Sequence, residues 1–168
     1  RCHRDWGFPR CRGCRARAGA TPPQGWALPT GIPAAPAPLI RCGVLTGGGA
    51  GFNRAKVTHG ESVVVIGVGG IGLNVIQGAA LSDGLPIIAI DTNPTKEAFA
   101  RQFGATHTLL AAKDDKGLIE ASKQVKKLVG RGADYAFECT AVHELGAAPQ
   151  PMICHGRTAL AFCRLRQS

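Results

Sequence analysis

The 168-residue sequence has no uninterrupted apolar run long enough to span a membrane. Asn74 and Gln77 interrupt the best candidate for such a span. Lysine is absent from both ends of the chain, because every lysine lies between Lys56 and Lys127. The lack of a membrane-spanning run leads us to expect a soluble, cytoplasmic protein with no membrane partner. Its length is typical of one domain of ordinary size.

Acidic residues are scarce where the positive charge gathers. The chain carries a net charge of +9, of which residues 1–17 contribute +5 and residues 157–168 contribute +3. The 139 residues between them hold eleven basic and ten acidic side chains. A nucleic-acid-binding domain would instead carry its basic residues on a folded surface, among groups that stack on or read bases. The distribution of charge therefore argues against nucleic acid as a partner.

Cysteine follows the pattern neither of a disulfide framework nor of a structural metal site. An odd number of cysteines is scattered along the chain, at Cys2, Cys11, Cys14, Cys42, Cys139, Cys154 and Cys163. Cys11 and Cys14 have the spacing of half a zinc knuckle, but no second pair follows them. We interpret this pair as incidental.

The two ends differ in composition from the middle. Residues 1–38 are rich in Arg, Pro and Ala without an apolar period, so we expect an irregular or disordered segment. Their Arg-rich, acid-poor start is compatible with a transit peptide, although the serine content and the amphipathic pattern of one are missing. Residues 157–168 form an atypical basic tail. The lysine-free, arginine-rich composition of the two ends is typical of out-of-frame translation.

Between these ends, strand-like apolar runs alternate with helical patterns. A glycine-rich turn at the start of residues 39–56 is expected to lead into a helix that ends near Lys56. Further helices are predicted over residues 71–81, over TNPTKEAFARQFG and over residues 116–129. Asn93 caps the second of these and Pro94 takes its first position. The third places Leu118, Ile119, Val125 and Leu128 on one side.

Strands are predicted at SVVVIG, at PIIAID (86–91), at THTLLA (106–111) and at ADYAFECT (133–140), with a possible fifth at GRTALAF (156–162). A short helix interrupted near Pro149 and Pro151 precedes the last of them. This alternation predicts an α/β fold, a Rossmann-like doubly wound parallel sheet with right-handed crossovers, truncated and with irregular N- and C-terminal extensions.

The segment VVVIGVGGIGLNVIQG (63–78) carries the most specific motif. Gly67, Gly69 and Gly72 follow a strand and open a helix, and Asp91 ends the next strand nineteen positions after Gly72. In dinucleotide binding the glycines permit a tight turn, approach of a pyrophosphate and close packing of helix on strand. The helix N-terminus attracts the phosphates, and the acid accepts the ribose hydroxyls and selects NAD over NADP. In the alternative interpretation, the glycines merely shape a turn and Asp91 caps a loop.

The residues also resemble a known family. CGVLTGGGAGFNRAKVTHGESVVVIGVGGIGLNVIQGA, IIAIDTNPTKEAFARQFGATH and GADYAFECT are similar to the coenzyme domain of zinc-dependent alcohol dehydrogenases, in the medium-chain dehydrogenase superfamily. The similarity covers residues 39–156 and implies NAD and zinc as cofactors. The chain is accordingly divided into an irregular segment (1–38), an NAD-binding Rossmann domain (39–156) and a basic tail (157–168).

The resemblance assigns roles to individual residues. It implies that Cys42 is a catalytic zinc ligand, that Thr46 lies close to the nicotinamide, that Ile71 backs the nicotinamide ring and that Lys96 contacts the adenosine. Without the resemblance, Cys42 would be interpreted as a small buried residue. For Lys96 an exposed helix face is an equally good interpretation. The expected cofactor-binding residues are Gly67, Val68, Gly69, Gly70, Ile71, Gly72, Asp91, Asn93 and Lys96.

The family transfers hydride between a small-molecule alcohol or aldehyde and NAD, with a zinc ion held by two cysteines and one histidine. The resemblance implies that Cys42 supplies only one of these three ligands, so we expect a catalytically incomplete fragment of an enzyme whose intact form is a homo-oligomer. Two alternatives stay open. The chain is a nucleotide-binding module without catalysis, or it derives from a medium-chain enzyme acting on polyols or on thiol–aldehyde adducts.

Overall fold

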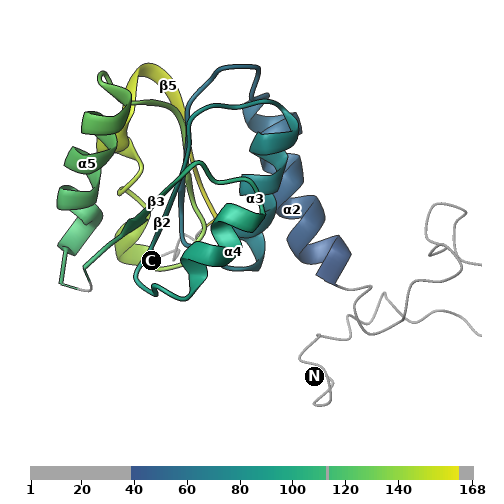
Figure 1. Ribbon diagram of the computed structural model, residues 1–168, viewed down its shortest axis with the longest axis horizontal. Coiled ribbons are helices and arrows are strands. Elements are labelled where there is room, and N and C mark those ends of the chain that lie inside the picture. The colour runs from purple at the N-terminus through teal and green to yellow at the C-terminus, as the bar shows by residue number, and fades with distance from the viewer. Residues whose placement is uncertain (1–38, 113, 163–168) are drawn as a thin grey trace, which may run out of the picture. The chain divides into compact units, whose positions relative to one another are not determined.

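The computed structural model describes residues 39–112 and 114–162, and in these the strands form a single parallel sheet (Figure 1). The strand order is β3-β2-β1-β4-β5, so the chain moves outward from β1 in one direction and then in the other. This is the doubly wound arrangement predicted from the sequence. The strands are β1 (Val63–Ile66), β2 (Ile87–Asp91), β3 (His107–Leu110), β4 (Ala133–Glu138) and β5 (Ile153–Ala161).

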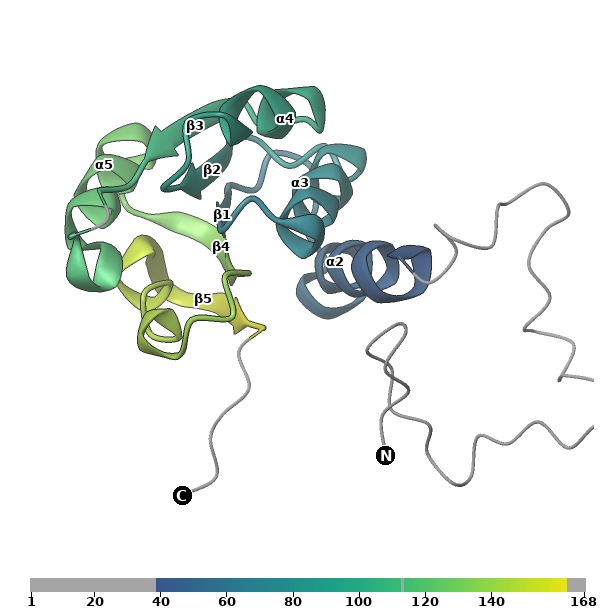
Figure 2. The same cartoon turned by 90° about the horizontal axis from the view of Figure 1, so that it is seen from below.

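Helices cover both faces of the sheet, as Figure 2 shows with α3 and α5 on opposite sides. The α-helices are α2 (Leu45–Gly49), α3 (Gly70–Leu81), α4 (Lys96–Gln102) and α5 (Ile119–Val129). No helix among the described residues is both long and apolar enough to cross a membrane.

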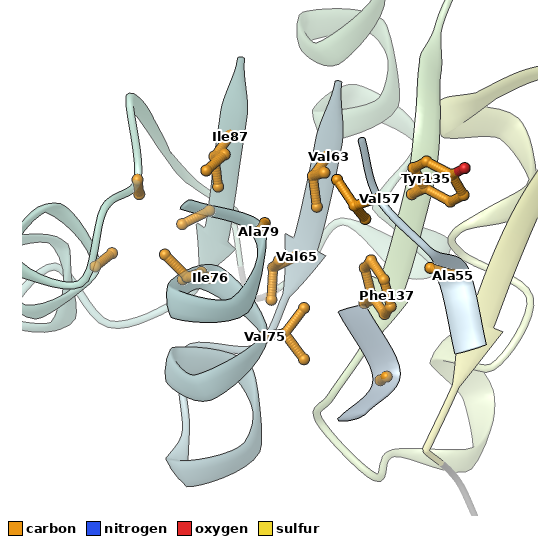
Figure 3. Close-up of a cluster of buried hydrophobic side chains, with 14 of the residues drawn as sticks. Ala55, Val57, Val63, Val65, Val75, Ile76, Ala79, Ile87, Tyr135 and Phe137 are labelled. Atoms are coloured by element: carbon orange, nitrogen blue, oxygen red, sulfur yellow. The ribbon is translucent and has the colours of Figure 1, made fainter. Parts of the chain in front are cut away.

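Successive side chains of a strand point to opposite faces of the sheet, so they belong alternately to two core clusters. Val63 and Val65 of β1 join the cluster drawn in Figure 3, which α3 covers with Val75 and Ile76. Val64 and Ile66 face the other way, toward α5. All four β1 residues are at most 2% exposed. Burial on both faces explains why this strand is an uninterrupted apolar run.

The glycine-rich turn expected after residue 39 is not found. The chain is helical from Ile40 to Ala55, with π-helical turns at Ile40–Val44 and Ala50–Ala55 on either side of α2. We call residues 40–55 the leading helix. Its end was predicted correctly, because Lys56 adopts a left-handed conformation with φ of 56° and stops it.

Close packing on α3 explains one glycine of the leading helix, Gly47. A Cβ atom on Gly47 would lie 2.5 Å from the carbonyl oxygen of Ile71 and 2.7 Å from Cβ of Asn74. A Cβ on Gly51 would lie 3.7 Å from the carbonyl carbon of Gly78. A side chain is thus excluded at Gly47 but would make only an ordinary contact at Gly51. Gly47 lets the two helix backbones approach each other, and sequence reasoning took this glycine-rich stretch for a turn.

Two predicted helices begin differently from the expectation. The helix α4 starts at Lys96, because the Asn93 carboxamide oxygen accepts bonds from the Thr95 N–H (3.0 Å) and hydroxyl (2.8 Å) in the turn before it. Pro94 lies in that turn, outside the helix.

The helix α5 starts at Ile119, after a break at Gly117 and Leu118, which both have positive φ. The break resets the helical phase, so Leu118 is buried while Ile119 is 61% exposed. Val125 is buried as expected, but Leu128 is 44% exposed. The Asp115 carboxylate accepts N–H bonds from Ile119 (3.0 Å) and Glu120 (3.1 Å) and caps this helix.

The last strand is longer than predicted. The helix expected before it is reduced to 3₁₀ turns at His143–Leu145 and Gln150–Met152, and β5 begins at Ile153, three residues before the predicted start, and ends at Ala161. Arg157 on β5 bonds to Glu61 (3.0 Å) and Asp134 (2.9 Å). The start of the expected basic tail is therefore part of the sheet. The expectations for residues 1–38, for Cys11 and Cys14, and for residues 163–168 concern parts of the chain outside the described residues.

Candidate functional site

The glycine turn joins β1 to α3 and is shaped by close contacts. Gly67 has φ of 89°, a conformation that favours glycine, and its N–H donates to the Ile90 carbonyl oxygen at 2.8 Å. A Cβ on Gly72 would lie 1.9 Å from the carbonyl oxygen of Gly67. The first turn of α3 can thus pack on the end of β1 only when residue 72 has no side chain.

The middle of the turn is open. A Cβ on Gly69 or Gly70 would meet no atom within 4 Å. Gly69 is the N-cap of α3 and supplies no side-chain bond to the N–H groups of the first helical turn. Those N–H groups and the helix dipole favour a negatively charged ligand. The open surface and the uncapped helix fit a pyrophosphate group well.

Asp91 lies at the carboxyl end of β2, which pairs with β1, and its carboxylate reaches the glycine turn. Oδ2 accepts the Val68 N–H at 2.8 Å and lies 3.2 Å from Nζ of Lys96, while Oδ1 accepts the Asn93 N–H at 2.9 Å. Burial alone would raise the pKa of Asp91. The N–H bonds from Asn93 and Val68 and the Lys96 ammonium outweigh it and lower the pKa. The carboxylate is therefore held in its charged form.

Four of the residues expected at the cofactor lie together in the structure. Val68, Asp91, Asn93 and Lys96 form one hydrogen-bonded group beside the open glycines. Lys96 is neither fully exposed nor directed into solvent, because its ammonium pairs with Asp91. Ile71 is partly buried against the core below the turn.

The leading helix, which carries Cys42 and Thr46, also reaches the glycine turn. A Cβ on Gly43 would lie 3.7 Å from the carbonyl oxygen of Gly70, so the leading helix passes beside the turn itself. Cys42 and Thr46 are both exposed. The exposure of Cys42 contradicts its interpretation as a small buried residue.

A zinc site is not assembled by the described residues. Within residues 39–112 and 114–162, no three His, Cys, Asp or Glu side chains gather where they could hold a metal ion. A catalytic zinc requires three protein ligands. Cys42 therefore stands without the partners that a zinc ion would require from this part of the chain.

Sequence reasoning missed Glu138, the last residue of β4, and Thr140, which follows this strand; both lie next to the turn. A Cβ on Gly67 would lie 2.7 Å from Cγ2 of Thr140. Oε1 of the fully buried Glu138 accepts bonds from the Thr140 N–H (2.6 Å) and the Thr140 hydroxyl. An acid inside the apolar run ADYAFEC was the available signal. Its position became clear only with the β1–β4 register, in which Ile66 pairs with Glu138.

Between these two residues lies a thiol with little reactivity. Burial, and secondarily the Glu138 carboxylate, raise the pKa of Cys139 to about 12. The thiolate is the nucleophilic and metal-binding form of cysteine. Cys139 therefore behaves as a packing residue.

Comparison with known proteins places these features in context. Residues 70–160 match the family model described as zinc-binding dehydrogenase. The S-(hydroxymethyl)glutathione dehydrogenase of Synechocystis sp. is 46% identical over 101 residues, which cover 60% of this chain and 27% of that protein. Alcohol dehydrogenase-like 7 of Arabidopsis thaliana is 40% identical over 112 residues, covering 67% of this chain and 28% of that protein. The chain thus spans little more than a quarter of these relatives.

Solved structures agree with the fold. Benzyl alcohol dehydrogenase from Acinetobacter calcoaceticus superposes with a TM-score of 0.73 at 25% identity, over 84% of this chain and 38% of that one. An alcohol dehydrogenase zinc-binding domain protein from Burkholderia ambifaria gives a TM-score of 0.72 at 26% identity, over 84% of this chain and 37% of that one. Both similarities extend over most of this chain and a little over a third of the solved protein.

Proposed function

The chain belongs to the family of zinc-binding dehydrogenases, and we propose that residues 39–156 form the NAD-binding domain of an alcohol dehydrogenase. One observation carries this proposal. The Asp91 carboxylate lies at the end of the strand beside β1, bonded to the turn whose open glycines lead into an uncapped helix. This is the arrangement needed to hold a pyrophosphate and a ribose side by side.

In this proposal each residue type has a task. Gly67, Gly69, Gly70 and Gly72 make room for the pyrophosphate, and the N–H groups of the first turn of α3 bind it. Asp91 accepts a ribose hydroxyl, while Asn93 and Lys96 hold the carboxylate in place. Ile71 and Thr46 lie on the side where the nicotinamide would extend. Bound NAD would supply the hydride acceptor, and these residues would fix its position.

Cofactor selection follows from the charge of Asp91. A 2′-phosphate about 4 Å from this carboxylate would meet a repulsion of about 4 kcal/mol per charge pair at an effective dielectric constant near 20. The Lys96 ammonium, 3.2 Å from Oδ2, offsets part of that repulsion. We therefore propose NAD as the preferred cofactor, with a smaller preference than an unpaired aspartate would give.

Cys42 is proposed as a ligand of the catalytic zinc in the longer family members. Because the described residues hold no three-ligand cluster, the chain as it stands is expected to bind NAD without oxidising alcohols. Purified chain with NAD, zinc and ethanol should show no NADH absorbance. Turnover that disappears in Cys42→Ser would contradict this expectation.

The substrate of the complete enzyme is proposed from its relatives. Several similar proteins are named S-(hydroxymethyl)glutathione dehydrogenase, which favours a thiol–aldehyde adduct over a polyol. We further propose a cytoplasmic homo-oligomer for the complete enzyme. A nucleotide-binding module without catalysis is the second candidate function, supported by a complete adenosine side beside an isolated Cys42.

Replacement of Asp91 tests the cofactor assignment. In Asp91→Ser the ribose acceptor and its charge are lost, so NAD should bind roughly ten-fold more weakly while the preference over NADP shrinks. Calorimetric titration of both cofactors measures the two effects. Glu120→Gln is the matched control, since it removes one negative charge from an exposed pair with Lys123 on α5. Equal affinities for NAD and NADP in the unchanged chain would contradict the proposal.

A further inference from the structure

A hydrogen bond crosses from β2 into the glycine turn. The Val68 N–H donates to Oδ2 of Asp91 at 2.8 Å, although the two residues are 23 positions apart. Val68 is 4% exposed, so its N–H has little access to water. A buried N–H left without an acceptor costs about 1–3 kcal/mol. The carboxylate therefore satisfies a group inside the turn before any ligand is present.

The turn needs such a constraint, because three of its four residues between β1 and Ile71 are glycines. Glycine loses more conformational freedom on ordering than any other residue. Gly69 and Gly70 have no neighbouring atoms that a side chain could touch. The bond at Val68 lies between Gly67, with its positive φ, and these open positions, where it can hold the turn in one shape.

The carboxylate is also nearly fully occupied. An ionised carboxylate offers about four acceptor positions. Val68 and Lys96 take two of them on Oδ2, and Asn93 takes one on Oδ1. A ribose hydroxyl therefore has a free position on Oδ1, while Oδ2 is committed to holding the turn.

We propose that Asp91 is a positioning residue for the pyrophosphate turn as well as the ribose acceptor. The two carboxylate oxygens have different roles. Oδ2 fixes the turn by accepting the Val68 N–H, and Oδ1 accepts a hydrogen bond from a ribose hydroxyl. This inference rests on the proposed function in that the turn binds a pyrophosphate.

The direction of the change in pyrophosphate affinity distinguishes a positioning role of Asp91 from a purely electrostatic one. A carboxylate repels a nearby pyrophosphate, so loss of its charge alone should strengthen pyrophosphate binding. Loss of the hydrogen bond that holds the turn should instead weaken pyrophosphate binding. Asp91→Asn removes the charge but keeps an oxygen that can accept the Val68 N–H, whereas Asp91→Ala removes both.

The experiment titrates inorganic pyrophosphate, which has no ribose, into the full chain and follows the backbone amide signals by NMR. We expect Asp91→Asn to bind as tightly as the unchanged chain or several-fold more tightly, and Asp91→Ala to bind roughly five- to ten-fold more weakly. An Asp91→Ala variant that binds pyrophosphate as tightly as Asp91→Asn would overturn the proposal.

Amide hydrogen exchange without any ligand gives a second readout. Exchange at Val68, Gly69 and Gly70 should be at least ten-fold faster in Asp91→Ala and close to the unchanged rate in Asp91→Asn. Glu120→Gln is again the matched control, because it removes one carboxylate charge from an exposed pair with Lys123 on α5 and leaves the turn untouched. Exchange at these three amides that stays the same in Asp91→Ala would also overturn the proposal.

A backbone substitution covers the case in which Asp91→Ala does not fold. Replacing the Val68 amide by an ester removes the N–H donor while Asp91 stays in place. Weaker pyrophosphate binding in this variant supports the positioning role, and unchanged binding contradicts it. Failure of the unchanged chain to bind NAD would instead contradict the proposed function, while the exchange rates measured without ligand still decide the positioning role.

Discussion

The Asp91 group and the leading helix both reach the glycine turn but differ in how they are built. Around Asp91, hydrogen bonds join the acid, the turn, Asn93 and Lys96 into one group. On the leading helix, Cys42 and Thr46 are exposed and joined to no such group among the described residues. The first region comes from about thirty consecutive residues, whereas a three-ligand metal site requires residues from elsewhere in the fold. Local sequence can therefore specify a cofactor site more fully than a metal site.

Gly72→Ala should lower the free energy of unfolding most, because it disrupts the glycine turn beside Asp91 directly. The added Cβ would lie 1.9 Å from the Gly67 carbonyl oxygen, which is part of the backbone and has little room to move. Overpacking costs typically about 1–3 kcal/mol, and a backbone clash this close should exceed that range. Urea unfolding measures the loss. Gly70→Ala, where a Cβ meets no atom within 4 Å, should be close to neutral, and equal losses in both variants would contradict the account.

Gly47→Ala should lower the free energy of unfolding by an intermediate amount, because it pushes the leading helix away from α3 and leaves the Asp91 group unchanged. Its Cβ would lie 2.5 Å from the Ile71 carbonyl oxygen and force the leading helix away from α3. We expect a loss of about 1–3 kcal/mol in the free energy of unfolding. Gly49→Ala is the control on the same helix, since its Cβ would come no nearer than 3.8 Å, to Nδ2 of Asn53.

That control should stabilise the helix by up to about 1 kcal/mol, because alanine favours helix more than glycine does. A Gly47→Ala variant as stable as Gly49→Ala would show that the two helices do not pack through Gly47.

Cys42→Ser should have the smallest effect. The thiol is exposed, so the free energy of unfolding should change by less than about 0.5 kcal/mol. NAD affinity should also stay unchanged within error, in contrast to the loss expected for Asp91→Ser. A calorimetric titration run in parallel with both variants sharpens the comparison. A large loss of NAD binding in Cys42→Ser would mean that the leading helix takes part in holding the cofactor.

Much of the fold was predictable because its signals are local. The apolar run Val63–Ile66, the glycines after it and Asp91 predicted the strand, the turn and the acid at the next strand end. The helicity of residues 40–55 was not predictable in full, because Gly47 serves a contact with α3 that the sequence does not show.

The position of Glu138 depended in the same way on long-range information. Its place beside the turn follows from the pairing of β1 with β4, two strands far apart in the sequence. The start of α5 was missed for a local reason, since the positive φ of Leu118 is rare for a branched side chain.

The most direct test of the account is a calorimetric titration of NAD into the full chain, once with zinc and once with EDTA. The account assigns most of the NAD-binding energy to the turn of Gly67–Gly72 and to Asp91, and it assigns none to a metal ion, because the described residues form no three-ligand cluster. It predicts one NAD per chain with the same affinity in both conditions. NAD binding that requires zinc, or that is absent in both conditions, would contradict it.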